Sequence, residues 1–202
     1  MLENIEVLCH SSIKIHKQKV IYIDPFKIDK NYKDADIIFI THNHYDHYSE
    51  EDIDKIKKED TIIVAPERFN QDNIITVEPN KKYTVEGIKF ETIPAYNTNK
   101  PFHPKEKAWV GYILEIEGNQ YYIAGDTDIT EENKKVKCDV AFVPVGGTYT
   151  MDFKEAAMLV NEIKPKIAVP IHYGSIVGAK QDAMEFSKLV HPEIKCEILI
   201  KG

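Results

Sequence analysis

The chain has 202 residues, of which 43% are hydrophobic, and a formal net charge of −7. This length and composition are typical of a globular protein with a buried core, so we expect a single domain over residues 1–202. The negative charge and the lack of a long Lys or Arg run argue against a nucleic-acid partner, because phosphate backbones would be repelled.

Cysteine usage and the N-terminus indicate where the protein acts. The three cysteines, Cys9, Cys138 and Cys196, form no CxxC pair, which argues against a disulfide framework and fits a reducing compartment. The start of the chain lacks the basic region of a signal peptide, and no apolar stretch is long enough for membrane insertion. We therefore expect a soluble, cytoplasmic protein.

Short strands are expected in the first half of the chain, because apolar or alternating runs are separated by polar turns. Ser49 begins a helix, since Asp52 follows three residues later in a capping-box arrangement. The expected strands cover residues 5–8, 13–15, 20–23, 37–40, 61–65 and 88–93.

Strands and helices alternate in the second half. Asp152 can cap a helix that Pro165 ends. In this capping box the Glu155 side chain would accept a hydrogen bond from the Asp152 amide. A second helix is expected over residues 179–190. The expected strands cover residues 109–116 and 120–124, which form a hairpin, and 140–143, 167–170 and 198–200. This order predicts an α+β fold with sheets at its centre and helices outside.

Residues 41–47, Thr-His-Asn-His-Tyr-Asp-His, carry the strongest chemical signal. Three imidazoles and a carboxylate directly follow the buried strand expected at 37–40. Such nitrogen and oxygen donors suit zinc, iron and manganese, and no thiolate is needed. The alternative is a polar loop that happens to contain several histidines.

Two further residues share the context of this heptapeptide. Asp126 follows the strand expected at 120–124, and His172 follows the strand expected at 167–170. Taken singly, Asp126 is an ordinary turn residue and His172 an ordinary core histidine. Taken with the heptapeptide, they indicate a metal site assembled from strand ends.

The order HxHxDH, then Gly125-Asp126-Thr127, then a late histidine resembles the metallo-β-lactamase superfamily. The fuller strings look like its branch of small metal-dependent hydrolases, which is similar to L-ascorbate-6-phosphate lactonases and to N-acyl phosphatidylethanolamine phospholipase D. The resemblance covers nearly the whole chain, from Leu8 to His172. It implies a four-layer αββα sandwich with a dinuclear metal site at one edge of the two sheets.

The resemblance also implies a set of ligands for two divalent metal ions. Zinc is the first choice, with manganese or iron as alternatives. His42 and His44 would ligate one ion, and Asp46, His47 and His172 the other, with Asp126 bridging both. A metal-bridging hydroxide would attack the substrate. Asp46 would also act in catalysis, by orienting that hydroxide or passing a proton to the leaving group.

One ligand departs from the family pattern. The third histidine of the first metal site usually follows the strand expected at 88–93 within a few residues, but this chain has no histidine there before His103. Either the loop 96–104 brings His103 back to the metal, or His103 lies in a surface turn and the first site has only two histidines. Both alternatives stay open from the sequence.

Other polar residues are candidates for supporting roles. Asp24 can hydrogen-bond a ligand imidazole, and Thr41 and His10 are weaker candidates of the same kind. Lys100, Tyr149 and Tyr173 are candidates for contact with an anionic substrate, and the alternative for each is a solvated or packed side chain. Gly146 and Gly147 would let a loop pass close to the site.

We therefore expect a hydrolase of a small ester, lactone or phosphodiester, with a small anionic molecule as substrate. The alternative is an iron-dependent oxidoreductase on the same scaffold. The chain lacks a flavin-binding extension, and Asp46 stands where Glu would be expected, so the hydrolase is favoured.

Overall fold

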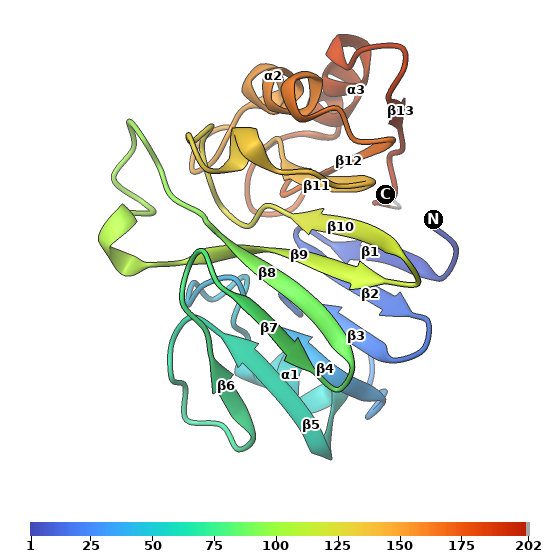
Figure 1. The fold of residues 1–202 in the computed structure, drawn as a ribbon, viewed down its shortest axis with the longest axis vertical. Coiled ribbons are helices and arrows are strands. Elements are labelled where there is room, and N and C mark those ends of the chain that lie inside the picture. The colour runs from blue at the N-terminus through green and yellow to red at the C-terminus, as the bar shows by residue number, and fades with distance from the viewer. Residues whose placement is uncertain (201–202) are drawn as a thin grey trace. The chain divides into compact units, whose positions relative to one another are not determined.

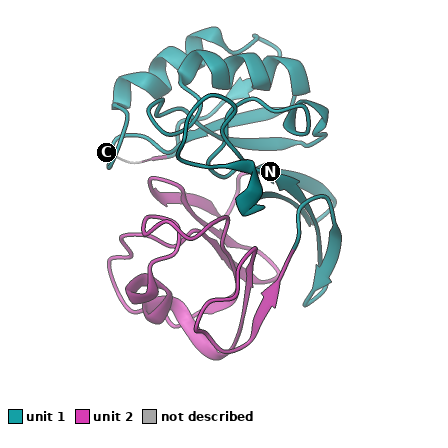
Figure 2. Ribbon diagram, turned by 90° about the vertical axis from the view of Figure 1, so that its left-hand side faces the viewer, with its two compact units in different colours: residues 1, 78–199 teal, residues 2–77, 200–202 magenta. Residues whose placement is uncertain are grey.

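The structure is a computed structural model and describes residues 1–200, which divide into two compact units (Figure 2). The N-terminal unit comprises residues 2–77 and residue 200, and the C-terminal unit comprises Met1 and residues 78–199. Each unit is built around its own sheet (Figure 1). The single domain expected over residues 1–202 stays a prediction.

The sheet of the N-terminal unit has six strands in the order β1-β2-β3-β4-β5-β6. The first three are antiparallel, and β3 to β6 are parallel. The strands are β1 (Ile5–Cys9), β2 (Ser12–His16), β3 (Val20–Ile23), β4 (Ala35–Phe39), β5 (Lys57–Ala65) and β6 (Ile74–Thr76). Because two successive reversals separate β1 from β3, the carboxyl ends of β1, β3 and β4 all lie at the same edge of this sheet.

Burial explains the centre of this sheet. Residues 37–40 are all fully buried, as expected of a parallel strand with both faces covered. Helix α1 (Glu50–Ile56) packs Ile53 and Ile56 into the same core as Ile38. Ser49 accepts a hydrogen bond from the Asp52 amide at the start of α1, which confirms the predicted cap.

The sheet of the C-terminal unit has seven strands in the order β13-β12-β11-β10-β9-β8-β7. Strands β7 to β10 are antiparallel, and β10 to β13 are parallel. The strands are β7 (Lys82–Val85), β8 (Ile88–Pro94), β9 (Val110–Ile116), β10 (Asn119–Ile123), β11 (Val140–Pro144), β12 (Ile167–Ile171) and β13 (Lys195–Cys196). The carboxyl ends of β8, β10, β11 and β12 therefore share one edge.

Two helices lie beside the parallel part of this sheet, α2 (Phe153–Ile163) on β11 and α3 (Lys180–Leu189) on β12 (Figure 1). The predicted capping box of α2 is confirmed, since Asp152 accepts from the Glu155 amide and Glu155 accepts from the Asp152 amide. The helix ends at Lys164, whose backbone is left-handed, as is common at a helix C-terminus, and Pro165 follows, which cannot continue the helix. Two short 3-10 helices cover Lys105–Lys107 and Asn133–Lys135.

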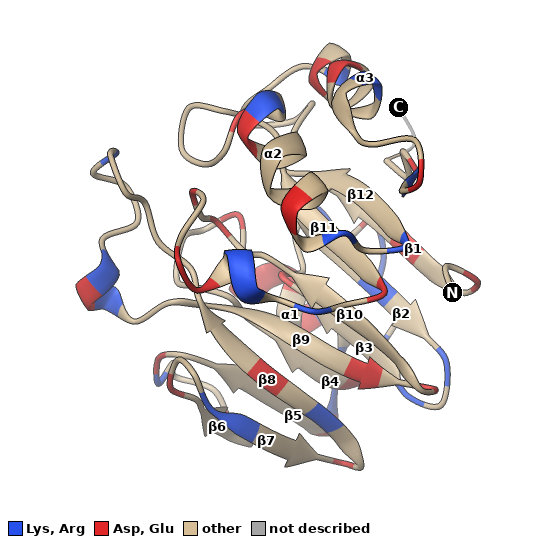
Figure 3. Cartoon of the chain, turned by 45° about the horizontal axis from the view of Figure 1, so that its top comes forward, with Lys and Arg blue, Asp and Glu red and all other residues tan. Residues whose placement is uncertain are grey.

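The antiparallel part of the sheet carries charges of both signs (Figure 3). Lys82 lies 3.6 Å from Glu91 on the neighbouring strand, and Lys89 lies 3.8 Å from Glu115. These pairs are well exposed, so each contributes little to stability. They identify this surface as a solvated face of the sheet.

Most predicted elements are present with their ends shifted by a few residues, but the strand predicted at residues 198–200 is wrong. The last strand is β13, which pairs with β12 only as far as the bond from the Glu197 amide to the Ala168 carbonyl. The apolar run that follows has no ladder partner, and Ile198 is 45% exposed. Strands β6 and β7 were not predicted, because one is very short and the other is a polar edge strand.

Among the described residues, no helix has the length and apolarity required to cross a bilayer.

Candidate metal centre

The heptapeptide lies at the carboxyl edge of the N-terminal sheet, directly after β4. The amides of His47 and Tyr48 both donate to the His44 carbonyl, which closes a tight turn. The turn buries His42, Asp46 and His47 and leaves His44 half-buried. The four predicted ligands of this unit are therefore brought to one place by local backbone geometry.

The ring nitrogens of these histidines converge. His42 Nε2 lies 3.1 Å from His44 Nδ1, and the ring centroids of His42 and His47 are 4.0 Å apart. Asp46 Oδ2 lies 3.7 Å from His47 Nε2. Nitrogen and oxygen donors at this spacing, away from solvent, are typical of a metal site.

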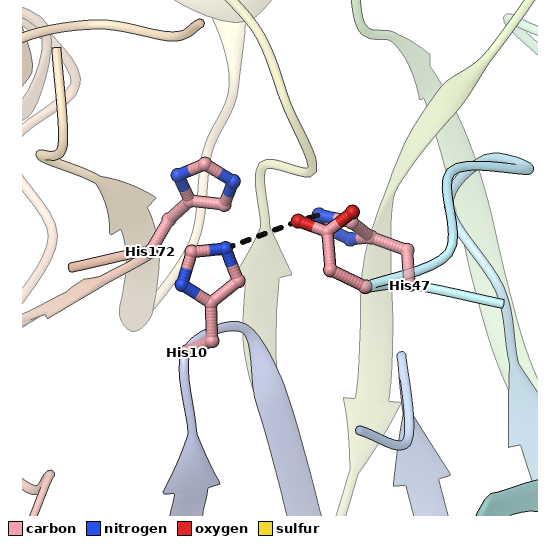
Figure 4. A group of neighbouring side chains, drawn as sticks. His10, His47 and His172 are labelled. Atoms are coloured by element: carbon pink, nitrogen blue, oxygen red, sulfur yellow. Dashed lines mark ion pairs between the residues drawn. The ribbon is translucent and has the colours of Figure 1, made fainter. Parts of the chain in front are cut away.

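His10 joins this group, although the sequence indicated only a weak supporting role. It follows β1, whose carboxyl end shares an edge with β4, and its ring is fully buried. His10 Nε2 lies 3.2 Å from Asp46 Oδ2, as the dashed line in Figure 4 shows. His10, Asp46 and His47 offer ligand atoms within 4.8 Å of one another. The strand order could have indicated this, but it is not visible in a single sequence.

Asp24 fixes the orientation of two imidazoles in the N-terminal unit. It follows β3 and is fully buried, and its Oδ2 accepts from His47 Nδ1 at 2.7 Å. The same oxygen accepts from the Thr41 hydroxyl at 2.7 Å, and that hydroxyl lies 3.0 Å from His42 Nδ1. Because Thr41 donates to the carboxylate, its oxygen accepts from His42 Nδ1. Both histidines therefore carry the lone pair on Nε2, the atom available to a metal.

The environment of Asp24 also affects its ionisation. Complete burial raises the pKa of this carboxyl overall, although the charge interaction with His47 and the hydrogen bonds from His47 and Thr41 oppose that rise. The predicted hydrogen bond between Asp24 and an imidazole of the heptapeptide is confirmed, with His47, a predicted ligand, as the donor. Asp24 and His10 are also among the non-glycine residues with positive φ, at 46° and 55°, a strained conformation that functional sites often hold.

The C-terminal unit has its own predicted ligands at the carboxyl edge of its sheet. Asp126 follows β10 and His172 follows β12, and both are buried. Asp126 Oδ2 lies 3.0 Å from His172 Nε2 and 3.3 Å from His103 Nε2. One carboxylate oxygen therefore lies close to two imidazoles, and the role of Asp126 as a bridge between two metal ions stays a prediction.

His103 is not in a surface turn. Its exposed fraction is 1%, so the alternative that left it on the surface is wrong. Its Nδ1 lies 3.0 Å from Asn97 Oδ1 and 3.2 Å from the Tyr149 carbonyl oxygen, both of which are acceptors. A neutral His103 is therefore protonated on Nδ1 and presents the lone pair of Nε2 to Asp126.

This arrangement fits a divalent cation. A nitrogen lone pair and a carboxylate oxygen that face each other at 3.3 Å repel unless a positive charge lies between them. Donor atoms around tetrahedral zinc at 2.0–2.2 Å stand about 3.3 Å apart. The spacings of His103, His172 and Asp126 agree with this value, as does the His42–His44 spacing. These predicted ligands thus have donor atoms and separations that are compatible with a divalent metal ion.

Comparisons with known proteins agree with the fold and with this chemistry. A family model described as a beta-lactamase superfamily domain matches residues 4–172. A UPF0173 metal-dependent hydrolase from Pyrococcus abyssi is 31% identical, and the match covers 98% of this chain and 96% of that protein. A structure described as a metal-dependent hydrolase from Parabacteroides distasonis has a TM-score of 0.82 at 31% identity, covering 98% of this chain and 93% of that one.

The same fold occurs in proteins with other chemistry. CmlA, a diiron β-hydroxylase from Streptomyces venezuelae, has a TM-score of 0.76 at 14% identity, covering 97% of this chain and 52% of that chain. An identity this low shows the fold alone.

The fold and the matches define the class as metallo-β-lactamase-fold proteins, so the predicted α+β class and superfamily are confirmed. Within that class, the chain belongs to the beta-lactamase superfamily and to its UPF0173 metal-dependent hydrolases. The closer likeness to L-ascorbate-6-phosphate lactonases stays a prediction, as does the ligand role of each residue. The sequence did not indicate a role for Asn97, because its hydrogen bonds to His103 depend on how the loop 96–104 folds.

Proposed function

We propose that this protein is a dinuclear metal-dependent hydrolase of a small anionic ester, lactone or phosphodiester. The observation that carries the proposal is the matched orientation of the imidazoles. His42, His47 and His103 each have Nδ1 placed as a hydrogen-bond donor, which leaves Nε2 as the ligand atom. Histidines in an ordinary polar loop would not share one tautomer fixed by buried acceptors.

The ligand set in this proposal is the one the sequence predicted. It comprises His42, His44, Asp46, His47, His103, Asp126 and His172, with zinc as the first choice and manganese or iron as alternatives. Two such ions would acidify a bound water and polarise the carbonyl or phosphoryl oxygen of the substrate.

Asp46 is the residue to which we assign proton transfer. Its exposed fraction is 8%, so its carboxylate is largely shielded from bulk water. His10 Nε2 lies 3.2 Å from Asp46 Oδ2. The other oxygen, Oδ1, can take a proton from the attacking water and return it to the leaving group.

Exposed aromatic rings beside the ligands support a substrate with an organic part. Phe102 is 40% exposed and Tyr149 is 36% exposed, and their rings meet edge to face with centroids 4.7 Å apart. Phe102 adjoins His103 in sequence, and the Tyr149 carbonyl accepts from His103 Nδ1. We assign these rings to the apolar portion of the substrate.

Composition and charge complete the proposal. They support a small-molecule substrate, no nucleic-acid partner, no membrane insertion and a cytoplasmic location. The proposal also includes a single hydrolase domain over residues 1–202.

Elemental analysis of the purified protein, paired with a hydrolysis screen, tests the proposal. About two zinc or manganese ions per chain are expected, with turnover of nitrophenyl esters, lactones or bis(nitrophenyl) phosphate that a chelator abolishes. Asp126→Ala should lose metal and activity together. His191→Ala is the control, because His191 is exposed and far along the chain from the ligands.

Two outcomes contradict the proposal. Hydrolysis that persists in protein stripped of metal would exclude a metal-dependent mechanism. Iron with a visible absorbance band and no hydrolysis would favour the oxidoreductase alternative instead.

A further inference from the structure

His103 reaches its position on a long loop. Strand β8 ends at Pro94 and β9 begins at Val110, so His103 lies several residues from either strand. Asp126 and His172, by contrast, follow within three residues of a strand end. A metal ligand must nevertheless be held to within about half an ångström of its productive position. The hydrogen bonds of this loop therefore have to supply the precision.

Asn97 closes the loop on His103. The Asn97 amide donates to the His103 carbonyl at 2.8 Å, and Asn97 Oδ1 accepts from the His103 amide at 2.9 Å and from His103 Nδ1 at 3.0 Å. Asn97 is buried, with an exposed fraction of 8%. Three bonds between the same two residues fix both the backbone and the ring of His103.

The orientation of the Asn97 amide is itself determined. Its Nδ2 donates to the Tyr149 carbonyl at 2.9 Å and to Asp128 Oδ1 at 3.2 Å. Both partners are acceptors only, so Nδ2 must face them and Oδ1 must face His103. A flipped amide would place Asn97 Oδ1 opposite two other buried acceptors and leave them without a donor, which is unfavourable.

Asp128 anchors this arrangement to the strand end that carries Asp126. Its exposed fraction is 3%, and it accepts from the Thr98 amide at 2.8 Å and from Lys100 Nζ at 2.5 Å. The Asp128 amide in turn donates to the Tyr96 carbonyl at 3.0 Å. Lys100, which the sequence offered as a substrate contact, instead neutralises Asp128. One buried carboxylate thus ties the start of the loop to the Gly125-Asp126-Thr127 turn.

We propose that Asp128 and Asn97 are positioning residues that place His103 Nε2 as a metal ligand and set its tautomer. The inference rests on the proposed metal site and adds how this chain supplies a third histidine from a loop. Asp128 acts on Asn97, Asn97 acts on His103, and neither need touch the metal. Outer hydrogen-bond partners of this kind commonly alter metal affinity by about 10- to 100-fold.

The test uses Asn97→Ala and Asp128→Asn in the full chain, with zinc affinity measured by competition with a chelator. Each variant should weaken one of the two zinc equivalents by about 10- to 100-fold and leave the other unchanged. Asn161→Ala is the control for Asn97, since Asn161 also bridges two backbone groups, the Leu189 carbonyl and the His191 amide. Asp139→Asn is the control for Asp128, because Asp139 accepts from a backbone amide and a lysine.

Nitrogen-15 NMR of the histidine rings in metal-free protein separates this inference from the proposed function. Wild type should show His103 protonated on Nδ1. Asn97→Ala should lower the fraction protonated on Nδ1, because the nearer of its two acceptors is lost and the Tyr149 carbonyl at 3.2 Å remains. Zinc affinity equal to wild type in both variants, or an unchanged His103 tautomer in Asn97→Ala, would overturn the inference. Wild-type protein that binds no zinc would contradict the proposed function, while the tautomer measurement would still decide the role of Asn97.

Discussion

His47 Nδ1 donates a hydrogen bond to Asp24 Oδ2 at 2.7 Å, with both groups fully buried. The Thr41 hydroxyl donates to the same oxygen, and the Thr41 amide donates to the other one at 2.8 Å. One carboxylate therefore serves three donors and, through Thr41, orients His42 as well as His47. Its position after β3 puts it at the sheet edge where the heptapeptide begins.

Replacing this carboxylate should weaken metal binding. In Asp24→Asn one acceptor oxygen becomes an amide donor, so at least one of the three buried donors loses its acceptor. We expect zinc affinity to fall by about 10- to 100-fold, measured by chelator competition. Asp34→Asn is the control, since Asp34 accepts from Lys14 and Tyr22 in the same unit. Equal losses in both variants would point to general destabilisation instead.

Local signals explain what the sequence predicted. The Ser49 and Asp152 caps, the Pro165 stop and the heptapeptide after a β-branched strand all depend on neighbours within a few positions, and each agrees with the structure. The edge strand β7 was missed because its residues are polar and mostly exposed.

Long-range pairing explains what the sequence left open. His10 belongs to the candidate site only because β1 runs parallel to β4 three places across the sheet, which is a property of strand order. The burial of His103 depends on Asn97 and on the Tyr149 carbonyl, the latter far along the chain. No local pattern around Phe102-His103-Pro104 distinguishes this loop from an exposed turn.

The acid dependence of stability can be predicted for Asp52. Burial alone would raise its pKa, but hydrogen bonds from Lys55, Ser49 and the Ile28 amide lower it overall. A carboxyl with a lowered folded-state pKa stabilises the fold above its ordinary pKa of 3.8, and this contribution is lost as pH falls through the folded value. Asp52→Asn should therefore reduce the free energy of unfolding by about 1–3 kcal/mol at neutral pH.

Urea unfolding from neutral pH down to about pH 3 checks this expectation, because the gap between Asp52→Asn and wild type should narrow over the acidic end. Glu51→Gln is the matched control. Glu51 pairs with the same Lys55 but has an 83% exposed side chain, so its removal should change stability by at most about 0.5 kcal/mol at any pH. A gap for Asp52→Asn that stays constant down to low pH would contradict the lowered pKa.

Truncation of the exposed aromatic pair should alter substrate preference. Phe102→Ala and Tyr149→Ala should each raise KM about tenfold for substrates with an aryl or alkyl group and leave KM for compact substrates unchanged. Metal content should stay at the wild-type level, since the Tyr149 backbone that holds His103 is retained. Met158→Ala removes a side chain that is 64% exposed on α2 and should change neither value. An equal rise in KM for both substrate types would contradict apolar recognition.

Gly146 packs against the backbone of His172, and a methyl group there should displace this predicted ligand. A Cβ on Gly146 would lie 2.3 Å from the His172 carbonyl oxygen, well inside contact distance. His172 has a φ of 60°, so its backbone has little freedom to move aside. Gly146→Ala should therefore cost about 1–3 kcal/mol in unfolding free energy and also lower zinc content per chain. Gly118→Ala separates the two effects, because Gly118 has a φ of 73° and open space around it; it should lose about 1 kcal/mol of stability and no zinc.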